Sequence, residues 1–301
     1  MAADLLPNAK PGRGNAPPML SMAALRWRRF QRHHMAMAGA TIILLLILAA
    51  IFAPLITPID PAKQALLLRV KPPSGAHWFG TDPYGRDVFT RLIYGTRISL
   101  KVGFVSVMIA MAVGVTLGSL AGYFGGWWDS IIMRVTDVFL SMPVFFLIIA
   151  VIAMFRPSEY NIIAVLGLTS WPGLARLVRG EFLSLRERDF VEAARATGAR
   201  DMRIVFRHVL PNALGPIIVA ATLRIAGAIL TESGLSYLGL GIQPPTASWG
   251  NMLQEGQPYL LVVPPAWWMA VFPGAAIFLT VMAFNAVGDG LRDALDPRMK
   301  H

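Results

Sequence analysis

The chain has 301 residues, of which 55% are hydrophobic and only 15% are charged, and its formal net charge is +10. A soluble domain usually has about a quarter charged residues, so this composition indicates a membrane protein. The basic residues form no single interleaved face, which argues against nucleic-acid binding, and the absence of cysteine excludes disulfides and thiolate metal sites.

Six apolar segments are long enough to cross a bilayer, which takes about 20 residues. Irregular backbone is unstable in lipid, so we expect all six segments to be helices. The expected spans cover residues 35–56, 98–123, 131–155, 161–178, 212–238 and 266–287.

Residues 1–34 form the expected N-terminal arm. Its first 20 residues are rich in Pro, Gly and Ala and are expected to be disordered. No small-x-small cleavage site follows the first apolar run cleanly, so we expect an uncleaved signal anchor. The arginines before that run, which favour a cytoplasmic N-terminus, are Arg26, Arg28, Arg29 and Arg32.

The Lys and Arg distribution along the other loops indicates the topology. Six spans return the tail, residues 291–301, to the cytoplasm, and the basic loop after the fourth span falls on the same side. The loop at 239–265 has no Lys or Arg and falls outside. The loop at 58–97 also falls outside, yet it is basic. We retain the orientation because three cytoplasmic regions agree with it. The conflicting residues are Lys63, Arg69, Lys71, Arg86, Arg91 and Arg97.

A charged patch at 192–211, EAARATGARDMRIVFRHVLP, separates two apolar segments. Asp189 can cap a first short helix, and Gly198 can end it in a left-handed conformation. Asp201 can cap a second helix that stops at Pro211. Two short helices with a glycine break suit docking on another protein.

The order and spacing of this patch resemble the EAA loop of permease subunits of ABC importers, which contacts the ATPase subunit in that family. Residues 80–97 and 121–143 resemble segments of the dipeptide and oligopeptide permease family, as do RHVLPNALGPIIVAATL, LSYLGLGIQPPTASWGNML and FNAVGDGLRDALDPR. The pattern is similar to the C-type member of the permease pair. A histidine at position 208 is usual in the peptide branch.

The resemblance implies an all-α membrane protein with six transmembrane helices and the type I ABC importer permease fold. It divides the chain into a first transmembrane helix at 35–57, a periplasmic loop at 58–97 and a five-helix core at 98–290. The core would contain a cytoplasmic coupling loop at 181–210. The positions to which the resemblance assigns ATPase coupling are Glu192, Ala193, Ala194, Gly198, Asp201, His208, Leu210 and Pro211.

The resemblance also implies partners and a location. These are a second homologous permease in a heterodimer, two ATPase subunits or domains that bind ATP and Mg, and a periplasmic or lipid-anchored solute-binding protein that faces the outer loop. The complex would lie in the bacterial inner membrane, in contact with lipid. The implied solutes are di- or oligopeptides, with nickel, glutathione or another small solute as the alternative.

Several kinds of chemistry are missing from the sequence. It has no G-x-x-x-x-G-K-[ST] loop, so we expect no ATPase site in this chain. No His and Glu cluster has metal-ligand spacing, and no catalytic Ser, His and Asp set can be argued, so we expect neither cofactor nor enzyme activity. A secondary transporter is the competing class. It predicts inverted repeats and a row of intramembrane acids, and neither is found.

Charged residues within spans are costly and therefore informative. Arg224 and Glu232, in the fifth span, are candidates for the wall of the translocation path, and a buried pairing role is equally open. Arg134 and Asp137 lie one turn apart and can form a structural pair. Gly114 and Gly118 form a small-xxx-small pair, which we expect to pack within the subunit.

Overall fold

The computed structural model describes residues 22–154 and 158–295, so the expected disorder of residues 1–20 lies outside the described part. Within it, helices form all the regular secondary structure except one isolated bridge between Thr81 and Asp87. Five of the described helices are long and apolar enough to cross a membrane, or six if one bent pair counts as a single span.

The described chain forms long helices joined by short helices and loops. The helices are α1 (Met22–Arg32), α2 (His34–Ile51), α3 (Ala53–Ile56), η1 (Leu66–Leu68), α4 (Val88–Phe124), α5 (Gly126–Ser141), α6 (Val144–Met154), α7 (Glu159–Arg186), α8 (Asp189–Ala196), α9 (Asp201–Ile204), η2 (Val205–Val209), α10 (Leu210–Tyr237), α11 (Trp249–Gly256), η3 (Gln257–Leu260) and α12 (Trp268–Leu295).

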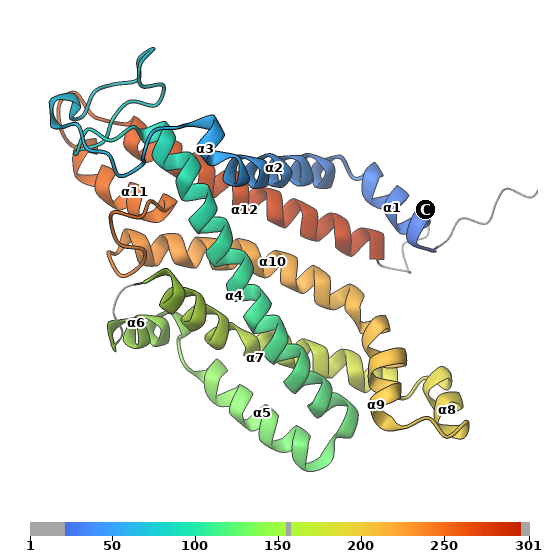
Figure 1. The fold of residues 1–301 in the computed structure, drawn as a ribbon. Coiled ribbons are helices and arrows are strands. Elements are labelled where there is room, and N and C mark those ends of the chain that lie inside the picture. The colour runs from blue at the N-terminus through green and yellow to red at the C-terminus, as the bar shows by residue number, and fades with distance from the viewer. Residues whose placement is uncertain (1–21, 155–157, 296–301) are drawn as a thin grey trace, which may run out of the picture.

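The helix α4 is the longest single helix of the described chain and packs along α7 (Figure 1). The two backbones approach closely at glycines. A Cβ atom on Gly114 would lie 2.8 Å from the Leu174 Cβ atom, and one on Gly118 would lie 2.5 Å from the Ala175 carbonyl oxygen. The expectation that this glycine pair packs within the subunit is confirmed.

The two ends of the helical body differ. The helix α1, the end of α12 and the α8–α9 segment lie at one end, whereas α11 and the long segment before α4 lie at the other (Figure 1). His33 Nε2 lies 3.6 Å from Asp293 Oδ2, which joins the two terminal regions. The chain therefore begins and ends its described course on the same side of the helices.

The third expected span, 131–155, is wrong as a single straight helix. The helices α5 and α6 meet at an angle of 87°. Met142, which precedes Pro143, has extended dihedral angles (φ −89°, ψ 139°). A residue before proline is disfavoured in the α region because its backbone clashes with the proline ring, so the helix breaks there.

The start of α4 also differs from the expected boundary at residue 98. Asp87 caps the helix, and its side chain accepts a 2.8 Å hydrogen bond from the Thr90 backbone N–H. The non-helical segment therefore ends at Asp87, and the last ten residues of the expected outer loop, 88–97, are helical.

The caps and the end of the two short helices were also predicted wrongly. Asp189 and Asp201 are the first helical residues, and Arg188 and Arg200 occupy the cap positions without side-chain caps. The second helix does not stop at Pro211. It continues through the π-helical turn η2 into α10, where the Leu210 N–H donates to the Val205 carbonyl. Pro211 comes just after this π-helical turn, whose wider bonding already interrupts the regular i→i−4 ladder, so the proline does not end the helix.

The expected pair of Arg134 with Asp137 is wrong. The Asp137 carboxylate instead accepts a 2.7 Å hydrogen bond from Arg176 Nη2 on α7, and Arg134 is exposed. The tertiary packing of α5 beside α7 supplies a partner that the sequence of α5 alone did not indicate.

Candidate functional site

The first candidate site is the turn between α8 and α9. The N–H of Gly198 donates to the Arg195 carbonyl at 2.9 Å, and the N–H of Ala199 donates to the Ala194 carbonyl at 3.1 Å. This pair of bonds is the Schellman arrangement, which needs a left-handed residue after the helix. Gly198 has φ +80°, so its predicted conformation is confirmed.

Buried aliphatic residues hold this turn against the membrane helices. Val191 of α8 and Ile204 of α9 are fully buried in a cluster with Val178 and Phe182 of α7. The opposite surface is open, because Glu192, Ala193, Gly198 and Asp201 are all exposed, while Ala194 is partly buried. The segment is thus fixed on one side and available to a partner on the other.

Tyr123, at the end of α4, joins this turn and was missed by sequence reasoning. Its hydroxyl donates a 2.7 Å hydrogen bond to Asp201 Oδ1, and the Arg195 guanidinium lies 5.8 Å from the centre of its ring. No local pattern signals a contact between residues this far apart in the chain. Tyr123 therefore bonds the start of α9 to the end of α4.

The other three predicted coupling residues lie past this turn. His208 and Leu210 are half-buried and Pro211 is exposed. The His208 carbonyl accepts a 2.6 Å bond from Asn212 Nδ2, so it is satisfied at the junction where η2 meets α10. The structure therefore joins these residues to the turn through one continuous helical segment, Asp201–Tyr237.

The second candidate site is a cavity of about 580 Å³ between α4, α6, α7 and α10. Its walls are mostly apolar. Of the described residues that line it, Arg224 is the only ionisable one. Arg224 Nη1 lies 3.4 Å from the Ser170 carbonyl oxygen. The structure therefore places one of the two intramembrane candidates at a cavity.

Glu232 lies elsewhere, fully buried inside the protein and not in the lining of that cavity. Its Oε1 atom accepts a 2.7 Å bond from the Ser236 hydroxyl, and Ser99 of α4 and Ser248 before α11 also lie beside the carboxylate. Within the described residues it forms no ion pair with Arg224. The carboxylate gathers hydroxyl groups from three parts of the chain, which suits a structural role.

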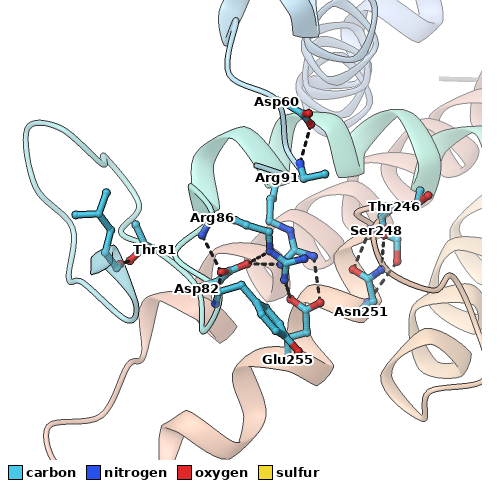
Figure 2. A network of polar contacts seen from close by, with 12 residues as sticks. Asp60, Thr81, Asp82, Arg86, Arg91, Thr246, Ser248, Asn251 and Glu255 are labelled. Carbon is cyan, nitrogen blue, oxygen red and sulfur yellow. Dashed lines mark hydrogen bonds and ion pairs between the residues drawn. The ribbon is translucent and has the colours of Figure 1, made fainter. Parts of the chain in front are cut away.

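A buried ionic cluster lies at the other end of α4 and joins the segment before α4 to α11 (Figure 2). Arg86 Nε lies 2.5 Å from Asp82 Oδ2, and Arg91 Nη1 lies 2.6 Å from the same oxygen. Glu255 of α11 accepts from Arg86 Nη2 at 2.6 Å and also pairs with Arg91. Two acids thus neutralise two arginines, both of which were counted in the basic segment 58–97 that conflicted with the predicted topology.

The comparisons with known proteins agree with this architecture. Residues 114–301 match the family described as "Binding-protein-dependent transport system inner membrane component", and residues 21–73 match the "N-terminal TM domain of oligopeptide transport permease C". A chain of the inward-facing methionine ABC transporter MetNI superposes with a TM-score of 0.54 at 23% identity, covering 68% of this chain and 96% of that chain.

Curated relatives are similar over nearly the whole length. The dipeptide transport system permease protein DppC of Alkalihalophilus pseudofirmus is 45% identical, and the match covers 95% of both chains. The glutathione transport system permease protein GsiD of Pectobacterium atrosepticum is 47% identical over 91% of this chain and 90% of the relative.

These matches and the helical architecture define a multi-pass inner-membrane protein with the type I ABC importer permease fold. The class is that of the membrane-embedded subunits of binding-protein-dependent importers. Within this class, the chain belongs to the oligopeptide and dipeptide permease family of ABC transporters.

Proposed function

We propose that this subunit moves peptides across the inner membrane, driven by ATP that separate subunits hydrolyse. The observation that carries the proposal is the similarity to dipeptide and glutathione permeases along nearly the whole chain. Glutathione is itself a peptide, so both relatives favour a solute with peptide bonds and a free carboxylate. Nickel is the alternative solute, and the chain itself is proposed to hold no ATPase site and no cofactor.

The proposed partners are a second homologous permease, two ATPase subunits or domains and a solute-binding protein. The turn around Gly198 suits the ATPase contact, because it is anchored by Val191 and Ile204 and exposed on its other side. ATP binding would bring the two ATPases together and move both coupling turns. The rigid helix from Asp201 to Tyr237 would carry that movement to the cavity, switching its access between the two sides of the membrane.

Reconstitution tests the proposed function. The complete complex is placed in liposomes with its binding protein, and uptake of labelled dipeptide, oligopeptide, glutathione and Ni²⁺ is compared. We expect uptake of at least one peptide, requiring ATP and Mg on the ATPase side and abolished without the binding protein. Uptake driven by an ion gradient in the absence of ATP would instead support a secondary transporter, and uptake of Ni²⁺ alone would overturn the peptide assignment.

We further propose that both termini lie in the cytoplasm, as the arginines of the arm favour. The natural chain has no cysteine, so single cysteines can report the topology. Leu67, 95% exposed in the outer loop, and Trp27, 58% exposed in α1, are suitable positions. A membrane-impermeant maleimide added to intact cells should label Leu67→Cys, and should label Trp27→Cys only after permeabilisation. The opposite labelling pattern would reverse the proposed orientation.

A further inference from the structure

The cavity between α4, α6, α7 and α10 has a mostly apolar wall and a few polar groups. Its polar lining residues are Ser106, Ser170, Arg224 and Thr231, contributed by α4, α7 and α10. Its volume, about 580 Å³, lies within the range of roughly 300–1,000 Å³ typical of small-molecule sites. A mostly apolar pocket with a few convergent polar groups is the usual form of a ligand site.

Arg224 has unused capacity to bind an anion. A guanidinium carries five N–H donors, and across residues 22–154 and 158–295 this one has a single hydrogen bond, the 3.4 Å contact to the Ser170 carbonyl. It forms no ion pair with a carboxylate of the described residues. A positive charge within a membrane-spanning helix is costly unless an opposite charge or water meets it, so the cavity favours a negatively charged group.

Gly173 of α7 provides space for the guanidinium. A Cβ atom at this position would lie 2.5 Å from Arg224 Nη2, so any side chain here would displace the arginine. Gly173 follows Pro172, which lies inside α7. The glycine thus allows the guanidinium to lie against the α7 backbone at the edge of the cavity.

Ser106 is a second, independent polar group. The residue is 2% exposed and lines the same cavity, and its hydroxyl has no hydrogen-bond partner among the described residues. By contrast, the Thr116 hydroxyl on the same helix donates to the Ala112 carbonyl in the preceding turn. A buried hydroxyl without a partner costs free energy unless a ligand or water bonds to it.

We propose that this cavity receives the carboxylate of the transported peptide, with Arg224 as the anion-binding group and Ser106 as a hydrogen-bonding group for the same solute. The inference rests on the proposed peptide import and adds a carboxylate site in the permease itself. The two N–H groups of a guanidinium edge match the two oxygens of a carboxylate, which selects a free C-terminus over an amide.

The test compares uptake of one peptide with that of its C-terminal amide in proteoliposomes, each loaded on the binding protein beforehand. Arg224→Gln should reduce uptake of the free acid by about tenfold to a hundredfold, as expected when a charge-assisted hydrogen bond is lost. Uptake of the amide should change less than about twofold, because the amide makes no such ion pair. Arg224→Lys should recover part of the acid uptake, since it retains the charge but not the planar fork.

Two further variants sharpen the comparison. Gly173→Ala keeps Arg224 but displaces its guanidinium, so it should lower acid uptake more than amide uptake. Arg134→Gln removes an exposed arginine of α5 outside the cavity lining and should transport both peptides as the natural complex does.

The outcomes separate the possible roles of Arg224. Equal loss of acid and amide uptake, with a lower yield of assembled complex, would overturn the proposal and assign Arg224 to the contact with the second permease. Unchanged acid uptake in Arg224→Gln would also overturn it. The peptide is one that the natural complex takes up in the reconstitution described above; if no peptide is taken up there, the proposed peptide function itself is wrong and this proposal is overturned with it.

Discussion

Replacing Gly198 with valine should weaken the coupling of ATP hydrolysis to transport by about tenfold or more, while the membrane helices still insert. Gly198 has φ +80°, and a left-handed residue with a side chain costs about 1–2 kcal/mol, with a branched side chain at the unfavourable end. A Cβ atom at this position would have no neighbouring atom within 4 Å, so the effect is conformational and not a clash with surrounding groups.

The measurement is substrate-stimulated ATP hydrolysis by the reconstituted complex, together with the yield of assembled complex. We expect the stimulated rate of Gly198→Val to fall at least about tenfold. A cost of about 1.4 kcal/mol to the native turn lowers its population relative to other conformations by that factor. Gly198→Asn is the matched control, because asparagine adopts the left-handed conformation more readily than other residues with a side chain. Normal stimulation in the valine variant would show that this turn does not transmit the signal.

Breaking the ionic cluster of Asp82, Arg86, Arg91 and Glu255 should cause the largest loss of stability. Arg91 is 1% exposed and contacts both acids, so Arg91→Met would leave the buried cluster with an excess negative charge. Removing one partner of a buried ion pair costs about 3–5 kcal/mol. We expect a lower melting temperature and yield of the purified complex.

Two further variants test whether charge balance is the cause. The double variant Arg91→Met with Glu255→Gln restores neutrality and should recover much of the lost stability, which a double-mutant cycle would quantify. Arg69→Met is the control, because Arg69 lies in the segment before α4 but is exposed, and its side chain only donates to the Tyr259 hydroxyl at 3.1 Å. Equal destabilisation by Arg69→Met and Arg91→Met would contradict a special role for the buried cluster.

The cluster also accounts for two of the six basic residues that conflict with the expected placement of segment 58–97, whereas Lys63, Arg69, Lys71 and Arg97 are exposed. Arg86 and Arg91 were counted as free positive charges, yet each is neutralised by Asp82 and Glu255. The pairing could not be predicted, because Glu255 lies 164 residues beyond Arg91 and meets it only after α11 packs beside the start of α4. Counts of Lys and Arg indicate orientation only when the side chains are solvated, and those of Arg86 and Arg91 are buried.

Features that depend on local chemistry could be predicted from the sequence by itself. The length and apolar character of five spans follow from hydrophobic burial in lipid, and the left-handed turn at Gly198 follows from the absence of a Cβ atom. The pair Gly114 and Gly118 likewise predicted a close helix contact within the subunit, because small residues are needed wherever two helix backbones approach, but only the fold identified α7 as the partner.

Other features were decided only by the tertiary structure. The partner of Asp137 is Arg176 on α7, which packs beside α5. Around Glu232, the fold brings together serines from three segments of the chain. Arg224, on the same helix as Glu232, lines a cavity instead. The two residues share one span and lie eight positions apart, about 80° around the helix, so periodicity directs them differently but does not show what each one meets. Their surroundings depend on which helices pack against each face of α10, and that depends on contacts between segments far apart in the chain.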